Sequence, residues 1–205
     1  MLVFHKPRMV VFSIPRTGST SLHKALRPFA DIEWSNPPSR KHTNVRNFEK
    51  WATTRPRRIE TYTRVAVMRD PLARIASWYR YRRRPDMENP ENSTHGFTLS
   101  EYVAASISPN PPKPAKLGNQ YRFLCNADDE LAVNEILCIE RTDVMVDYFN
   151  GVFGDIELPH RNAAPNGAPD EALDLDPDVE ARFREVHVTE FDLFARVAET
   201  GRLSL

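Results

Sequence analysis

The 205-residue sequence carries no net charge, because its 28 lysines and arginines are matched by 28 aspartates and glutamates. Global charge therefore steers the chain toward neither polyanions nor polycations. Apolar residues make up 40% and charged residues 27%, which is a globular and not a disordered composition. The length fits one domain, residues 1–205, with enough buried apolar surface to fold without disulfides or metals.

Cysteine and long hydrophobic runs are both scarce. Cys125 and Cys138 belong to no CxxC pair or Cys/His cluster, so we expect two buried free thiols and no metal site. Residues 1–6 lack the apolar region of a signal peptide, and no stretch reaches the ~18 apolar residues of a membrane span. We therefore expect a cytoplasmic protein without stable membrane insertion.

Short apolar runs alternate with helical patterns along the chain. Buried strands are predicted at 9–14, 64–69 and 135–140, with a shorter one at 31–34. Helical spacing is found at 22–29, 45–53, 71–81, 145–152 and 177–200, and a capping box at 98–101 opens a further short helix. This alternation predicts an α/β fold of three layers, with a central parallel sheet flanked by helices.

A polar loop follows the first strand, at the edge where parallel α/β sheets bind ligands. The loop, residues 15–21, leads into a helix N-terminus, whose unpaired amides and dipole favour an anion. Gly18 allows close approach of the backbone, the hydroxyls after it are donors, and Arg16 offers a cationic fork for phosphate or sulfate. The alternative is an ordinary helix start with an incidental arginine. GxxxxGK[ST] is absent, which argues against a typical ATP or GTP site.

A second pair of polar residues follows the next strand. Arg69 ends this strand, and Ser77 lies two turns into the helix that Asp70 and Pro71 open. A long cation and a short hydroxyl suit a separate phosphate at the same sheet edge. The alternative is a surface salt bridge of Arg69 and a solvent-facing serine, since Arg74 and Ser77 lie opposite the apolar stripe of that helix.

Together the two motifs resemble those of the sulfotransferase superfamily. Residues 14–22, Ile-Pro-Arg-Thr-Gly-Ser-Thr-Ser-Leu, resemble its 5'-phosphosulfate loop, with arginine where many relatives carry lysine. Residues 69–79 resemble its 3'-phosphate motif and keep its arginine-to-serine spacing. The resemblance is strongest to Golgi-type carbohydrate sulfotransferases and their bacterial relatives, and weaker similarity extends to 139–141, 158–162 and 190–194.

The resemblance implies a P-loop-like fold and 3'-phosphoadenosine 5'-phosphosulfate as donor, with 3',5'-adenosine bisphosphate as product. The acceptor is a hydroxyl, for which polysaccharide, glycolipid, small metabolite and peptide tyrosine stay open and carbohydrate is favoured. It implies catalytic roles for Arg16 and His42, the latter as a base in a Lys41-His42-Thr43 element. The donor-binding residues that it implies are Arg16, Thr17, Gly18, Ser19, Thr20, Ser21, Arg69, Ser77, Arg161 and Asn162.

Two other functions remain in view. An atypical nucleotide-dependent kinase would need Mg²⁺, whereas sulfuryl transfer does not require a metal, because the transferred group carries less charge than phosphoryl. A non-catalytic polyanion-binding module would use arginine clusters at 55–64 and 80–84. No nucleic-acid-binding motif supports a DNA or RNA partner. Trp34, Trp51 and Trp78 are interpreted as core residues or as walls of a ring-binding cleft.

Overall fold

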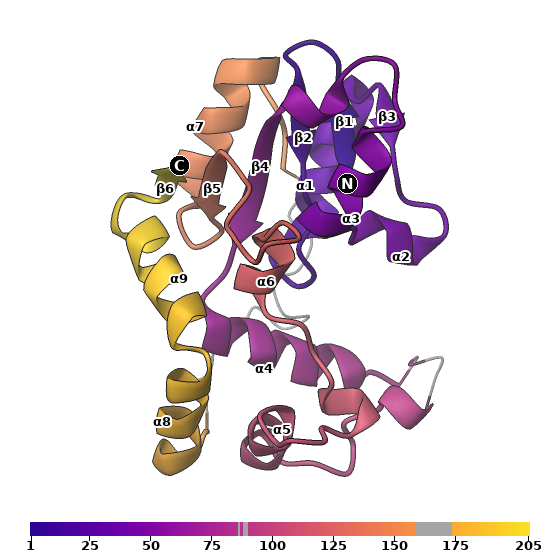
Figure 1. Cartoon of the computed structure of the whole chain (residues 1–205). Helices are drawn as coiled ribbons and strands as arrows, with labels where there is room; N and C mark the ends of the chain where they lie inside the picture. The colour runs from indigo at the N-terminus through magenta and orange to yellow at the C-terminus, as the bar shows by residue number, and fades with distance from the viewer. Residues whose placement is uncertain (86, 88–89, 159–173) are drawn as a thin grey trace.

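A computed structural model describes residues 1–85, 87, 90–158 and 174–205. A six-stranded sheet in the order β3-β1-β2-β4-β5-β6 lies at its centre (Figure 1). The strands are β1 (Leu2–Phe4), β2 (Met9–Val11), β3 (Ile32–Glu33), β4 (Thr63–Met68), β5 (Glu135–Cys138) and β6 (Arg202–Ser204). The helices are α1 (Ser19–Leu26), α2 (Pro38–Lys41), α3 (Val45–Ala52), α4 (Pro71–Arg82), α5 (Leu99–Ser106), α6 (Gln120–Leu124), α7 (Thr142–Phe153), α8 (Pro177–Val186) and α9 (Val188–Thr200). Short 3-10 turns cover Arg27–Phe29, Ile59–Thr61, Pro90–Asn92 and Lys113–Ala115.

The α/β prediction is confirmed, but the sheet is parallel only at its centre. Strands β2, β4 and β5 pair in parallel, while β1, β3 and β6 pair antiparallel to their neighbours. The first predicted strand is shorter than expected, because the chain leaves the ladder after a last hydrogen bond from the Phe12 amide to the Val65 carbonyl at 2.8 Å. Strands of three residues, such as β1 and β6, are too short to show a hydrophobic period.

The last predicted helix is two helices. His187 closes α8 and precedes α9 with φ −109° and ψ 22°, outside helical geometry. The start of α8 at Pro177 and the end of α9 before Gly201, at φ 82°, agree with the prediction. Both capping predictions upstream are also confirmed: Asp70 accepts from the Ala73 amide, and Thr98 forms a capping box.

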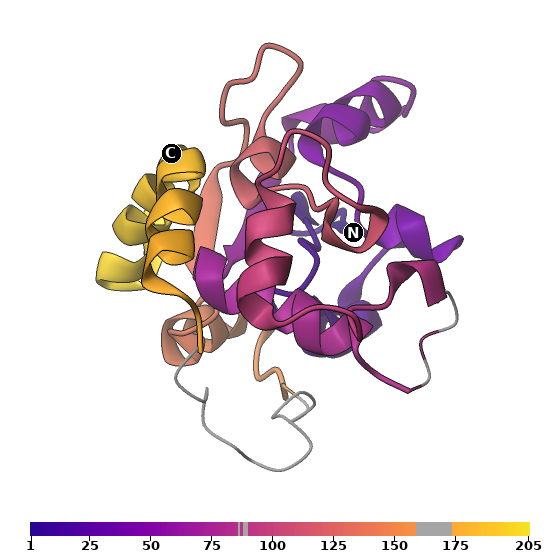
Figure 2. The ribbon, with the colours of Figure 1, turned by 90° about the horizontal axis from the view of Figure 1, so that it is seen from below.

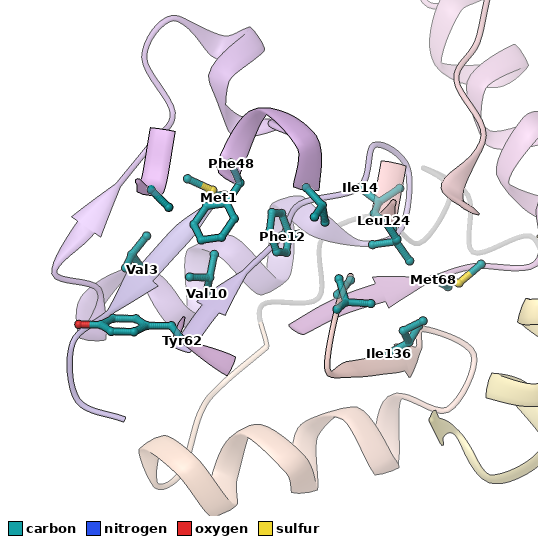
Figure 3. Close-up of a cluster of buried hydrophobic side chains, with 14 of the residues drawn as sticks. Met1, Val3, Val10, Phe12, Ile14, Phe48, Tyr62, Met68, Leu124 and Ile136 are labelled. Atoms are coloured by element: carbon teal, nitrogen blue, oxygen red, sulfur yellow. The ribbon is translucent and has the colours of Figure 1, made fainter. Parts of the chain in front are cut away.

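Both faces of the sheet are covered, which gives the three predicted layers. Alternate residues of each strand enter different cores, as the pleat of a strand requires. On one face α3, α6 and α9 cover the core shown in Figure 3, which includes Phe12, Phe48 and Leu124. On the other face α1 and α7 bury Leu26 and Phe149. Cys125 and Cys138 are buried and free, as predicted.

A third group of helices lies beyond the carboxyl end of the central strands. Strand β4 leads into α4, and α5 and α8 lie beyond it (Figures 1 and 2). Leu72, Tyr102 and Phe183 join these helices in a separate small core. Across the part of the chain that the structure describes, no helix combines the length and the apolar character needed to cross a bilayer. Within the same residues, no group of His, Cys, Asp and Glu side chains is arranged to hold a metal ion.

Candidate functional site

The loop after β2 forms the start of α1 at the carboxyl edge of the sheet. Arg16 and Gly18 have φ of 70° and 68°, in the left-handed region that turns the chain sharply. The Gly18 carbonyl then accepts from the Ser21 amide at 3.1 Å and the Leu22 amide at 3.2 Å. The first amides of the helix are left without intrahelical partners, so this end of α1 can receive an anion.

The loop packs tightly against Ile139, the residue that follows β5. A Cβ added at Gly18 would lie 2.7 Å from Ile139 Cδ1, so no other residue fits without movement. Thr17 is 1% exposed, and its hydroxyl donates to the Ile14 carbonyl at 3.1 Å. Thr17, which the family resemblance implied as a residue that binds the sulfuryl donor, therefore uses its hydroxyl inside the loop. Ser19 is buried and Thr20 is exposed.

Arg16 brings the two sequence motifs together. Its Nε and Nη2 donate to Ser77 Oγ at 3.0 and 2.9 Å, and its guanidinium lies 4.6 Å from the centre of the Tyr81 ring. Burial, with a further contribution from the Arg84 charge, lowers the pKa of Arg16 to about 10, so the group stays cationic at neutral pH. The guanidinium of Arg16 thus connects the loop after β2 to α4.

Arg69 follows β4 directly, as predicted, at the same edge. Its side chain is 22% exposed, and Nε lies 4.0 Å from Glu140 Oε1. Its peptide is held on both sides by Gln120: the Arg69 amide donates to Oε1 at 3.0 Å, and Nε2 donates to the Arg69 carbonyl at 2.8 Å. No sequence pattern indicates Gln120 as a neighbour of Arg69, because 51 positions separate the two residues.

The alternative interpretation of Ser77 as a solvent-facing serine is wrong. Arg74 and Ser77 are only 8% and 6% exposed, although they lie opposite the apolar stripe. The reason is that the helix is enclosed, with α5 and α8 on one side and the loop after β2 on the other. Arg74 Nε donates to the Pro15 carbonyl at 3.1 Å, which ties α4 to that loop.

His42 lies next to the end of β2, immediately after α2. Its Nδ1 is 2.7 Å from the Ser13 carbonyl oxygen. A carbonyl only accepts, so Nδ1 carries the hydrogen and Nε2 keeps its lone pair. Burial lowers the pKa of the ring below its usual 6.5, which keeps it neutral at neutral pH. A neutral imidazole with a free lone pair on Nε2 can accept a proton.

Lys41 is a candidate site residue that sequence reasoning missed. Its Nζ donates to Thr20 Oγ1 at 3.3 Å, so a second cation reaches the first turn of α1. Burial lowers the pKa of this half-buried amine. The signal was present in the Lys41-His42-Thr43 element, of which only the histidine was assigned a role.

Other sequence candidates have structural roles or lie elsewhere. Trp34 and Trp51 are in contact, with ring centres 4.2 Å apart, and pack against the core of the sheet. Arg82 and Arg83 donate to backbone carbonyls of Pro114 and Phe97, so part of the arginine cluster holds loops in place. Arg161 and Asn162 lie outside the described residues.

Comparison with known proteins identifies the family of the chain. The model of the sulfotransferase family matches residues 1–135, a stretch that contains the loop after β2, His42 and α4. No curated protein and no solved structure matches the chain. The match spans well over half of the sequence and includes every described site residue that was predicted. The chain therefore belongs to the sulfotransferase family.

Proposed function

We propose that the protein transfers a sulfuryl group from 3'-phosphoadenosine 5'-phosphosulfate to a hydroxyl of an acceptor. The observation that carries this proposal is the contact between Arg16 and Ser77 at 3.0 and 2.9 Å. It brings the loop at the start of α1 and the middle of α4 into one site. A donor with phosphate groups at the 3' and 5' positions of one ribose needs two anion sites close together. The resemblance of the two motifs favours carbohydrate as the acceptor class.

The donor would be held at both ends by charge-assisted hydrogen bonds. The first amides of α1, with Ser19 and Thr20, receive the 5'-phosphosulfate at the positive end of the helix. Arg69 and Ser77 receive the 3'-phosphate, which a planar guanidinium can bind with two parallel hydrogen bonds. Arg161 and Asn162 stay proposed nucleotide contacts through the family resemblance.

Two cations would stabilise the leaving group. As the S–O bond to the donor breaks, negative charge grows on the oxygen that bridges sulfur and phosphorus. Arg16 is part of the loop itself and Lys41 reaches it from the end of α2, and both can stabilise that charge. A single preorganised donor of this kind is typically worth ~10²–10³ in rate.

His42 would act as the base. Its Nε2 takes the proton of the acceptor hydroxyl while the acceptor oxygen forms a bond to sulfur. The S–O bond to the 5'-phosphate breaks in the same step, and 3',5'-adenosine bisphosphate leaves with the electron pair. The hydrogen bond from Nδ1 to the Ser13 carbonyl at 2.7 Å orients the ring and stabilises it once it is protonated.

Calorimetry with product nucleotides tests the two-site arrangement. The chain should bind 3',5'-adenosine bisphosphate at least about tenfold more tightly than AMP, because each charged hydrogen bond to the 3'-phosphate contributes ~1.5–3 kcal/mol. Arg69→Ala should erase most of that difference. Arg57→Ala, which removes an exposed arginine remote in sequence from both motifs, serves as the control. Equal affinity of the unaltered chain for the two nucleotides would contradict the proposal.

A further inference from the structure

Three buried polar side chains lie behind the two proposed phosphate sites. Arg74 of α4 is 8% exposed, Gln120 at the start of α6 is 0% exposed, and Glu190 of α9 is 2% exposed. Arg74 Nη1 lies 3.9 Å from Glu190 Oε1. The same oxygen accepts from the backbone amide and from Nε2 of Gln120, both at 2.9 Å. These contacts define one network from three segments that are far apart in the sequence.

One end of the network holds the anion loop. Arg74 Nε donates to the carbonyl of Pro15, the residue before Arg16, at 3.1 Å. Nη2 of the same guanidinium donates to the Gly118 carbonyl at 2.9 Å, just before α6. The guanidinium of arginine is planar and rigid, so its two donors hold these carbonyls in a fixed relative orientation. The single amine of lysine, on a flexible side chain, would not.

The other end holds the backbone of Arg69. The Gln120 side chain forms two hydrogen bonds with the backbone of Arg69. Its Oε1 accepts from the Arg69 amide at 3.0 Å, and its Nε2 donates to the Arg69 carbonyl at 2.8 Å. Glu190 in turn fixes the Gln120 amide group, because its Oε1 accepts from Nε2. The orientation of Gln120 is thus set by a charge on α9, beyond the stretch that the family model matches.

Stability alone does not account for this arrangement. A buried ion pair is weak support for stability, because well-packed apolar side chains of similar volume are often as stabilising. The network instead supplies directional contacts to two defined backbone segments. Each of those segments carries a cation that the proposed reaction needs, Arg16 on one and Arg69 on the other.

We propose that Arg74, Gln120 and Glu190 are positioning residues that fix the loop of Arg16 relative to Arg69. The two phosphate sites are then preorganised as a pair at the spacing of one donor molecule. This inference rests on the proposed function, since it concerns the binding of a ligand with two phosphate groups. Misplacement of either site by about 1 Å is enough to cost much of the binding or rate.

The test compares Glu190→Gln and Arg74→Lys with the unaltered chain. Glu190→Gln keeps the shape and removes the charge, and Arg74→Lys keeps the charge and loses the fork. Dissociation constants for 3',5'-adenosine bisphosphate and AMP are measured by calorimetry, well below the Tm of each variant. Both variants should bind the bisphosphate at least about tenfold more weakly and lose most of the preference over AMP.

Leu193→Ala is the matched control for stability. Leu193 is buried on the same helix as Glu190 but packs in the apolar core of the sheet. This variant should lower the Tm while leaving both dissociation constants within about twofold of the unaltered chain. If Glu190→Gln does not fold, Gln120→Leu takes its place, because it removes both hydrogen bonds to Arg69 at similar volume.

The outcomes separate this inference from the function on which it rests. An unaltered chain that shows no preference for the bisphosphate contradicts the proposed function, and the inference with it. Preferential binding by the unaltered chain, with unchanged dissociation constants in the folded variants, overturns the network's role alone. An equal loss of binding in Leu193→Ala would likewise overturn it, because general destabilisation would then explain the effect.

Discussion

His42 owes its protonation state to its immediate surroundings. The Ser13 carbonyl fixes the hydrogen on Nδ1, and burial lowers the pKa of the ring. A base is active when unprotonated, so its contribution should rise with pH through that lowered pKa and be complete at neutral pH. The nearby carboxylates are less suited, because Glu33 and Glu49 are paired with Arg27 at 2.7 Å and Arg64 at 2.6 Å.

We predict that His42→Ala lowers kcat by ~10²–10⁴, because the acceptor hydroxyl loses its base. The affinity for 3',5'-adenosine bisphosphate should barely change, since the nucleotide contacts lie elsewhere. The acidic limb of the kcat/KM profile should disappear in the variant. Steady-state kinetics across pH measure both effects, and His95→Ala, in an exposed loop, is the control. A variant with near-normal kcat would refute the assignment.

The lowered pKa of His23 predicts that the free energy of unfolding depends on pH. Burial lowers the pKa of its ring to about 4, and only 10% of the side chain is exposed. Below its ordinary pKa of 6.5 the unfolded chain binds a proton that the folded chain does not, so stability is lost as pH falls from 6.5 toward about 4. The loss contributed by this group is at most about 3 kcal/mol.

Urea unfolding at pH about 7 and about 5 measures this effect. His23→Gln removes the titrating group, so the difference in the free energy of unfolding between the two pH values should shrink. A variant whose pH dependence matches that of the unaltered chain would show that other groups are responsible.

At the scale of elements, the start of α1 depends on glycine at position 18. Gly18→Ala should destabilise the fold and weaken binding of 3',5'-adenosine bisphosphate. A backbone φ of 68° costs a residue with a Cβ atom ~1–2 kcal/mol, and the added carbon would also collide with Ile139. Chemical unfolding and calorimetry measure the two losses. Adding Ile139→Ala should relieve the clash while the backbone strain remains.

Gly151→Ala is the matched control in an exposed part of α7. A Cβ there meets nothing within 4 Å. Alanine is the better helix former, so this change should leave stability unchanged or raise it by up to about 1 kcal/mol. If Gly18→Ala behaved like Gly151→Ala, the loop would have more freedom than its packing against Ile139 indicates.

At the scale of the whole molecule, the site gathers cations at one edge of the sheet. Arg16, Lys41 and Arg69 reach this edge from the loop after β2, from α2 and from the end of β4. Together they can neutralise the phosphate and sulfate charges of the proposed donor. In phosphoryl transfer a divalent cation neutralises the corresponding phosphate charges. The C-terminal α9 and β6 complete one core and one edge of the sheet.

We therefore predict that sulfuryl transfer continues in excess EDTA, with kcat within about twofold of its value with Mg²⁺, because protein cations supply the charge that a metal would. A transfer assay with and without the chelator measures it. Complete loss of turnover that Mg²⁺ restores would instead favour a nucleotide-dependent kinase. A thermal shift with ATP and Mg²⁺ that exceeds the shift with 3',5'-adenosine bisphosphate would point the same way.

Much of this protein follows from its sequence. The three central strands, the helices after them and the caps at Asp70 and Thr98 come from local periodicity and capping chemistry. The loop at 15–21 and the Arg69–Ser77 pair are short motifs, so the residues that carry them lie within a few positions of one another and can be recognised together. Hydrophobic patterns and motifs of this kind act over a few residues, and they determine the fold class and the place of the site.

Tertiary structure decided what depends on residues distant in the chain. Three-residue strands β1 and β6 exist only because a sheet edge is available for pairing. The enclosure of α4 buries Ser77, which the helical pattern alone left open to solvent, and it brings the Ser77 hydroxyl to Arg16 across 61 positions. Gln120 meets Arg69, and Glu190 meets Gln120, only after the helices have packed. Local periodicity does not report such contacts, because it records which face of a helix is apolar and not what covers the other one.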